Sequence, residues 1–235
     1  MDLQTLIDWI GHGLCHQLPE RTLEAGGWHF AVCARDTGIH IAYAAALVVA
    51  ALQARILRLQ RKPVPADLPP LPVMALLGII FLPMAFDGLS SYLGFRETTN
   101  LLRYFTGLLA GLACGTLSAP LLASATVGSD SQQKAFAKPA SLLAQLLGSG
   151  ALASAFWLVY PHLGAAAPLL GAAAMVTLVA TLNLLVLVVS VRRRPIDCWQ
   201  AWLPWLGTAL LLALAEISLL SVLRYQVIDR LLGLF

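Results

Sequence analysis

The sequence predicts an all-α, polytopic integral membrane protein with about six transmembrane helices, preceded by an N-terminal amphipathic helix in the membrane interface. Hydrophobic residues make up 59% of the chain and charged residues only 11%, whereas soluble domains have about 25% charged residues. The mean hydropathy is +0.78. Apolar stretches of about 20 residues, enough to cross a hydrocarbon core roughly 30 Å thick, recur along the chain. We therefore expect a single membrane domain over residues 1–235.

The six predicted spans are separated by short polar segments. They cover residues 37–54, 71–93, 101–124, 140–160, 166–190 and 201–223. Residues 1–36 are expected to form an extracytoplasmic interfacial segment with a Cys/His motif. Residues 37–124 are expected to hold the motif-bearing helices, and residues 140–235 are expected to be scaffold helices.

Residues 3–14 have the spacing of an amphipathic helix that lies in the membrane interface. The apolar positions that recur at helical spacing are Leu3, Leu6, Ile7, Ile10 and Leu14. On a helical wheel, His12, Cys15 and His16 lie on the opposite, polar side. The proline-rich segment 63–72 predicts a stiff linker at the other side of the membrane.

The distribution of Lys and Arg predicts a protein of the cell membrane with both termini extracytoplasmic, because cytoplasmic loops are enriched in these residues. In this orientation the cytoplasmic loops hold Arg55, Arg58, Arg61, Lys62, Lys134, Lys138, Arg192, Arg193 and Arg194. The outer segments hold fewer basic residues, namely Arg21, Arg35, Arg96, Arg103, Arg224 and Arg230. No basic face of the kind that binds nucleic acid is apparent, so the lipid bilayer is the expected partner and nucleic acid is not.

Three polar stretches interrupt the apolar sequence, and all lie in its first half. They are HGLCHQLPER at 12–21, VCARDTGIH at 32–40 and DGLSSYLGFRETTNLLRYFTG at 87–107. The predicted topology puts all three at the outer face, because two crossings separate the second from the third. We therefore expect them to share one site.

Cysteine, histidine and aspartate in the first two stretches are ligands for zinc or another divalent transition metal. The predicted ligands are Cys15, His16, Cys33 and Asp36, and His12, His29 or His40 can replace either member of the adjacent Cys15–His16 pair. Two other interpretations stay open. Cys15 and Cys33 form a disulfide or redox-active pair, or both are unpaired structural thiols.

Arginines near the outer interface suit an anionic lipid or a lipid-phosphate group, because a guanidinium binds phosphate in a bidentate manner. The predicted substrate-binding residues are Arg21, Arg35, Arg96, Asn100 and Arg103. The alternative is that these arginines pair with nearby acids, namely Glu20, Asp36, Asp87 and Glu97. The segment ETTN at 97–100 is expected to cap the third span.

Carboxylates in or beside the spans are costly to bury and tend to face a cavity or a partner. Asp87, which follows Pro83 in the second span, and Glu97 are the predicted catalytic acid or base. Glu216 in the sixth span is open to the same roles. Its alternative is a hydrogen bond, as a protonated acid, to a neighbouring helix.

The motifs CHQLPER, CARDTGIHIAY and DGLSSYLGFRETTNLLRYFTG resemble a bacterial and archaeal family of predicted membrane proteins, domain of unknown function 2085. The resemblance covers roughly residues 12–110 and implies no established activity. It implies that the Cys15–His16 pair, the run from Cys33 to Arg35, Asp87 and the Arg96–Glu97 pair belong to the family motif. Relatives carry a second cysteine at the position of Asp36, and aspartate there favours a metal over a disulfide.

Three functions remain open from the sequence. The first is a metal-dependent enzyme that acts on a lipid or lipid-linked substrate, with hydrolysis as the first reaction class to test, because a bound metal acidifies water. The second is a transporter or lipid-handling protein. The third is a non-catalytic membrane subunit whose polar end binds a partner protein.

Overall fold

The computed structural model describes residues 2–125, 129–191 and 199–229. In this part of the chain, six helices are long and apolar enough to cross a membrane. They are α2 (Ala34–Leu59), α3 (Leu71–Tyr92), α4 (Asn100–Ser124), α5 (Pro139–Val159), α6 (Ala166–Val191) and α7 (Leu203–Leu223). The predicted fold class is confirmed, and each helix ends within a few residues of its predicted span.

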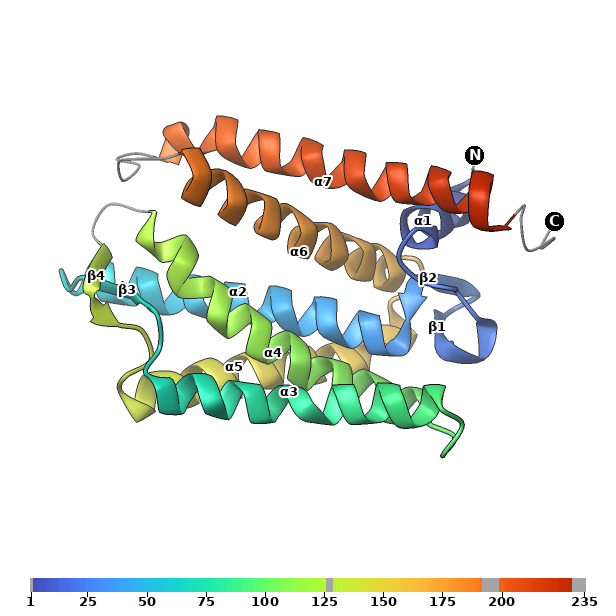
Figure 1. Ribbon diagram of the computed structural model, residues 1–235, viewed down its shortest axis with the longest axis horizontal. Helices are drawn as coiled ribbons and strands as arrows, with labels where there is room; N and C mark the ends of the chain where they lie inside the picture. Colours follow the sequence, from blue (N-terminus) through green and yellow to red (C-terminus); the bar gives the residue numbers. More distant parts are fainter. Residues whose placement is uncertain (1, 126–128, 192–198, 230–235) are drawn as a thin grey trace.

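The six helices run alongside one another, with α2 and α4 in the middle of the bundle (Figure 1). One end carries α1 (Leu3–His12), β1 (Thr22–Ala25) and β2 (Trp28–Cys33). We call it the motif end, because the start of α2 and the end of α3 also lie there. The opposite, distal end carries β3 (Val64–Asp67) and β4 (Ser129–Lys134). Short helical segments cover Pro19–Arg21, Tyr160–His162, Trp199–Trp202 and Arg224–Asp229.

Helix α1 has the predicted amphipathic character, but part of its apolar face packs against protein. Asp2 caps the helix by accepting a hydrogen bond of 2.7 Å from the Thr5 amide. Ile7 is completely buried and shares a core with Val32, Met175 and Ile217. The apolar spacing of α1 thus attaches it to β2, α6 and α7.

Two small sheets were not predicted. Strands β1 and β2 form an antiparallel hairpin whose turn residues, Gly26 and Gly27, have φ angles of 58° and 82°. A Gly-Gly turn between strands is a hairpin signal, because glycine reaches positive φ without steric cost. Within the predicted linker 63–72, β3 pairs in parallel with β4.

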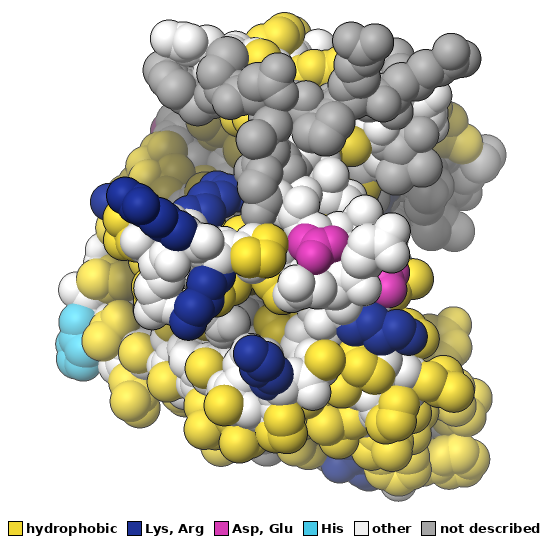
Figure 2. Space-filling model, turned by 90° about the vertical axis from the view of Figure 1, so that its left-hand side faces the viewer, with side chains coloured by type: hydrophobic (Ala, Val, Ile, Leu, Met, Phe, Trp, Pro, Cys, Tyr) yellow, Lys and Arg dark blue, Asp and Glu magenta, His cyan; other side chains and the backbone are white. Residues whose placement is uncertain are grey.

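Lys and Arg side chains gather over the distal end, with few acidic side chains between them (Figure 2). The segments that meet there hold Arg55, Arg58, Arg61, Lys62, Lys134 and Lys138. This grouping agrees with a cytoplasmic distal end, which remains a prediction. Arg192, Arg193, Arg194 and Arg230, used in the same prediction, lie outside the described residues.

Helices α2 and α4 approach so closely that their backbones touch. A Cβ atom added to Gly38 would lie 2.2 Å from the carbonyl oxygen of Tyr104, and one added to Gly107 would lie 2.0 Å from that of Arg35. Small residues permit such an approach between helices in lipid. The contact fixes the first turns of α2 against α4 and so determines where the side chains around Arg35 lie.

The helices of the second half form hydrogen bonds with α2, with α1 and with one another. Gln145 of α5 is buried and donates a 2.9 Å hydrogen bond to the Ala46 carbonyl of α2. Ser221 of α7 donates to the Trp9 carbonyl of α1 at 2.7 Å. Glu216 is exposed and accepts a 3.0 Å hydrogen bond from Asn183 of α6. It therefore contacts a neighbouring helix, but as the acceptor, and the bond does not require the predicted protonated acid.

Replacing Gly107 by alanine should lower the thermal stability of the purified protein in detergent. The new methyl group meets the Arg35 carbonyl, and overpacking of this kind costs about 1–3 kcal/mol. Gly78→Ala in α3 is the matched control, since nothing lies within 4 Å of its added Cβ. Alanine there should stabilise the helix by about 0.5–1 kcal/mol. Equal melting temperatures for the two variants would contradict the close α2–α4 contact.

Candidate metal and anion site

Cys15 lies in the loop between α1 and β1, which several hydrogen bonds hold in place. Gln17 has a φ of 51°, and its side-chain amide donates to the carbonyls of Asp8 at 2.8 Å and Ala31 at 2.9 Å. Arg224 donates to the carbonyls of His12 at 2.7 Å and Cys15 at 2.5 Å. The loop is therefore tied to α1, to β2 and to the segment that follows α7.

The predicted position of Cys15 on the polar side of α1 is wrong. The helix ends at His12, and the chain turns through Gly13 before it reaches Cys15. Cys15 is only 8% exposed and packs in the core shared by α1, β2, α6 and α7. A helical wheel extended past the end of the helix places such a residue on the wrong face.

Cys33 ends β2 and precedes the first residue of α2, so the start of that helix positions both Cys33 and Asp36. The Cys33 amide donates to the Cys15 sulfur at 3.2 Å. The Cys33 sulfur lies 3.3 Å from Oδ2 of Asp36. The sulfurs of Cys15 and Cys33 and a carboxylate oxygen of Asp36 all lie within 4.8 Å of one another.

Two thiols and a carboxylate at this separation suit a single zinc ion. Ligands of a tetrahedral zinc at about 2.3 Å lie roughly 3.7 Å apart, so small rotations of these side chains suffice. Both cysteines are free thiols. Among the described residues, this group would offer three ligands to a metal ion, and a tetrahedral ion would keep a fourth position for water or a substrate.

The two thiols differ in acidity. The pKa of Cys15 is lowered to about 7, mainly because the Cys33 side chain hydrogen-bonds to its sulfur. The pKa of Cys33 is raised, because that same contact and its burial favour the protonated form. The contact between the two cysteines therefore favours the thiolate of Cys15 over that of Cys33, and the thiolate is the form that binds metals.

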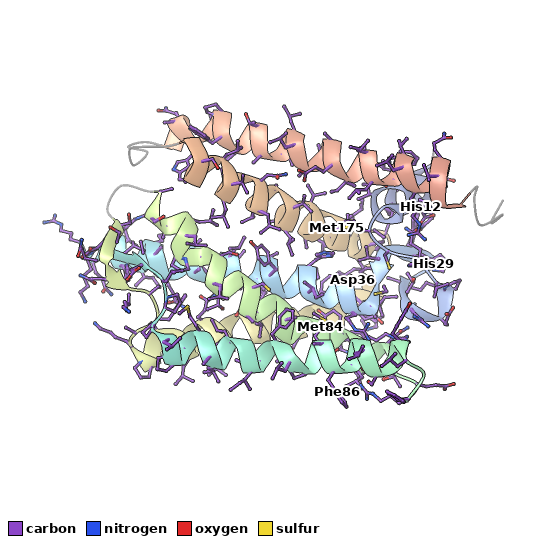
Figure 3. All side chains as sticks on the ribbon, viewed as in Figure 1. His12, His29, Asp36, Met84, Phe86 and Met175 are labelled. Atoms are coloured by element: carbon purple, nitrogen blue, oxygen red, sulfur yellow. The ribbon has the colours of Figure 1, made fainter. Side chains whose placement is uncertain are left out.

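The histidines predicted as ligands lie outside this group of three. His16 is exposed, and His12 stacks on Tyr225 with ring centroids 3.7 Å apart. His29 is exposed on β2. His40 lies one turn beyond Asp36 on α2. Figure 3 shows His12, His29 and Asp36 at the motif end.

Asp87 is the buried centre of a second cluster beside the thiols. Its carboxylate forms ion pairs with Arg35 of α2 and with Arg96, which follows α3. It also accepts hydrogen bonds from the hydroxyls of Thr98 at 2.8 Å and Thr106 at 3.4 Å. The side chain is 1% exposed, so these contacts replace water around its charge. The cluster joins the second and third polar stretches.

The arginines of the cluster outnumber its carboxylates. Arg103 is 8% exposed and donates to the Asn100 side chain at 3.0 Å, and it lies close enough to Arg21 and Arg35 to feel their charges. Asp87 forms ion pairs with Arg35 and Arg96, and among the described residues no carboxylate forms an ion pair with Arg103. A partly buried guanidinium without an ion pair suits an anion.

Two predicted site residues lie at the edge of this arrangement. Arg21 is exposed and pairs with its neighbour Glu20 at 3.7 Å. Glu97 is exposed, and no hydrogen bond or ion pair of the described residues joins it to Asp87 or the thiols. The ion-pair alternative for the arginines thus holds for Arg35 and Arg96 with Asp87 and for Arg21 with Glu20.

Several positioning residues were missed at the sequence level. Gln17 and Thr98 lie inside the quoted motifs, two residues after Cys15 and directly after Glu97. Their positions in the sequence could therefore have identified them as positioning residues. Thr106 also lies in the third motif, but only the packing of α3 against α4 brings its hydroxyl to Asp87. Thr99, in contrast, accepts a hydrogen bond of 3.3 Å from the Leu102 amide as the N-cap of α4, so the predicted cap is confirmed.

Asp87→Asn should destabilise the protein by about 3–5 kcal/mol, the usual effect of removing one partner from a buried ion pair. Asparagine keeps the size of the side chain but leaves two guanidinium groups without their counter-charge. Denaturation in detergent measures the loss. Glu97→Gln is the control and should stay within about 0.5 kcal/mol of the wild type, because Glu97 is exposed. Equal stability of the two variants would show that Asp87 does not hold the cluster.

The model of the predicted membrane protein family DUF2085 matches residues 15–117. The match begins at Cys15 and ends inside α4, so it contains both clusters. No solved structure matches this chain.

Two archaeal proteins are similar to part of this chain. An uncharacterized protein of Methanothermobacter thermautotrophicus is 32% identical over 105 residues, which are 45% of this chain and 84% of that protein. An uncharacterized protein of Methanocaldococcus jannaschii is 37% identical over 98 residues, which are 42% of this chain and 56% of that protein. Since the family model covers the motif-bearing helices and the first relative is matched over most of its length, the chain belongs to the DUF2085 family of predicted membrane proteins.

Proposed function

We propose that this protein is a metal-dependent membrane enzyme that acts on an anionic, phosphate-bearing lipid or lipid-linked substrate at the motif end. The observation that carries the proposal is the approach of the Cys15 and Cys33 sulfurs and an Asp36 oxygen to within 4.8 Å of one another. Catalytic zinc sites have three protein ligands and an open position, as this group would provide. A metal bound there would supply hydroxide near neutral pH by lowering the pKa of its water.

The arginine cluster supports an anionic substrate. Arg35 links the two clusters, because it lies between Cys33 and Asp36 in sequence and pairs with Asp87. Arg35 and Arg96 are held by Asp87 at fixed positions, while the guanidinium of Arg103 is balanced by no carboxylate contact among the described residues. Together with Asn100, these donors would bind phosphate oxygens beside the metal ligands.

The surroundings of Arg96 support a substrate that sits in the membrane. Phe86, Tyr92 and Phe95 are 69%, 88% and 79% exposed, and the Arg96 guanidinium lies 5.6 Å from the ring centre of Phe86. Exposed aromatic rings beside arginine are typical of the level at which lipid headgroups lie. A lipid whose phosphate reached Arg96 and Arg103 would keep its chains beside these rings.

The contacts of Asp87 and Glu97, the two predicted catalytic acids, favour different roles for them. Both oxygens of Asp87 accept hydrogen bonds from arginine, so Asp87 is better suited to position Arg35 and Arg96 than to take a proton. Glu97 is next to Arg96 and is exposed to solvent. We assign Glu97 as the acid or base that exchanges the proton with water.

Purified wild-type protein should contain close to one equivalent of zinc or another transition metal per chain, measured by plasma mass spectrometry. Cys33→Ser should remove most of this metal, because it deletes the sulfur that lies 3.3 Å from the Asp36 carboxylate. Cys114→Ser is the matched control, since Cys114 is a free thiol in α4 outside the group. Metal-free wild-type protein with a Cys15–Cys33 disulfide would favour the redox interpretation and overturn the proposal. Unchanged metal content in Cys33→Ser would overturn it as well.

A further inference from the structure

A cavity of about 440 Å³ lies in the distal half of the bundle. Helix α6 diverges from α2 towards the distal end (Figure 1), and the walls of the cavity include Leu47 of α2 and Leu184 of α6. Small residues make up much of the wall on α2 and α4, namely Ala50, Ala51, Ala54, Ala119, Pro120 and Ala123. The cavity exists because these short side chains do not fill the space between the helices.

The walls of the cavity are mostly apolar. Gln53 is one of the few polar side chains in them, and its amide donates to the Ser141 carbonyl at 3.5 Å and to the Gln145 side chain at 3.3 Å. Helix α5 therefore uses the protons of this amide. Apolar cavities stay free of water and bind apolar molecules, and pockets of about 300–1,000 Å³ with such walls are typical of small-molecule sites. The cavity thus suits a hydrocarbon chain.

A lipid chain can reach this cavity from the bilayer. The cavity is open over part of its boundary. Leu206 of α7, which belongs to its wall, is 47% exposed, and Ala51 of α2 is exposed as well. Both residues lie in helices long and apolar enough to cross a membrane. An apolar chain that enters beside them does not have to pass through water.

Cations surround the distal end of the cavity. Arg58, in the last turn of α2, belongs to the wall and is exposed. Lys134 directly precedes the wall residue Ala135, and Lys138 lies three residues before the wall residue Ser141. Figure 2 shows Lys and Arg side chains gathered over this end. Guanidinium groups bind phosphate, and basic groups at the cytoplasmic surface attract anionic lipids.

One face of α2 connects the apolar wall to this positive charge. Leu47, Ala51, Ala54 and Arg58 all line the cavity and follow one another by four, three and four residues. This spacing places them on one side of the helix over about 16 Å. A hydrocarbon chain that lies along this face would end with its headgroup beside Arg58.

We propose that the distal cavity binds one fatty acyl chain of an anionic phospholipid, whose phosphate lies beside Arg58. This site goes beyond the proposed function. Arg35 and Arg58 are 23 residues apart on α2, which corresponds to about 35 Å. The lipid at the distal end therefore lies in the other leaflet from a substrate at the motif end, and its binding needs no metal.

Native mass spectrometry of the full chain, released from detergent micelles, tests this inference because it counts the lipids that stay bound. The probes are phosphatidylglycerol and phosphatidylcholine with identical palmitoyl and oleoyl chains. One phosphatidylglycerol per chain should bind more tightly than phosphatidylcholine does. Ala54→Phe should weaken this binding about tenfold, because the ring takes the place of at least two methylene groups of the lipid. Ala123→Phe fills the cavity from α4 and should have the same effect.

Ala75→Phe in α3 is the matched control for these variants, since Ala75 is exposed and does not belong to the cavity wall. It should leave the binding of phosphatidylglycerol unchanged. Size-exclusion chromatography shows that each variant is folded. Phosphatidylglycerol bound as tightly by folded Ala54→Phe or Ala123→Phe as by the wild type would overturn the proposal.

Arg58→Gln leaves the cavity open and tests the headgroup contact by itself. It should lower the preference for phosphatidylglycerol over phosphatidylcholine about fivefold, the effect of one cation beside an anionic headgroup. Arg55→Gln, one turn earlier and outside the cavity wall, should lower it less. Equal binding of the two lipids by the wild-type protein would overturn the proposal. None of these results depends on the metal content that tests the proposed function.

Discussion

The buried carboxylate of Asp87 is the interaction on which the arrangement of the motif end depends. It belongs to α3, yet its partners Arg35, Arg96 and Thr106 come from α2, the segment after α3, and α4. A carboxylate removed from water needs such partners, because desolvation of its charge is costly. The cluster therefore fixes the end of α3 against a helix pair whose glycines already bring the α2 and α4 backbones into contact.

The positions of Cys15, Cys33 and Asp36 depend on the Asp87 cluster and on the contact between α2 and α4. Arg35 is bound to Asp87, and Cys33 and Asp36 lie on either side of it in the sequence, so the first turn of α2 cannot rotate freely. Cys15 reaches the same place from the other direction, through a loop that Gln17 and Arg224 hold. The proposed metal ligands and the arginines around Asp87 thus lie together, because the first turn of α2 carries Arg35 as well as Asp36. This proximity is what the proposed enzyme chemistry requires.

The helices were predictable because their apolar length alone determines them, whereas the site was predictable only in part. The three polar stretches meet as the topology indicated, and Cys15, Cys33 and Asp36 come together. His16 does not join them, since adjacent residues on a turning chain point in different directions. The hairpin was hidden in an apolar stretch with only Gly26 and Gly27 as a signal. Cys15 is buried because α1 ends at His12 and the chain then turns. The composition of the sequence does not indicate where this helix ends.

X-ray absorption spectroscopy at the edge of the bound metal tests the central claim most directly, because it identifies the ligand atoms and their distances. We predict two sulfur ligands at about 2.3 Å and oxygen or nitrogen ligands at about 2.0–2.2 Å, as zinc has with thiolate and carboxylate. Cys33→Ser protein loaded with the same metal should show one sulfur fewer. A spectrum without sulfur ligands in the wild-type protein would contradict a metal site built from Cys15, Cys33 and Asp36.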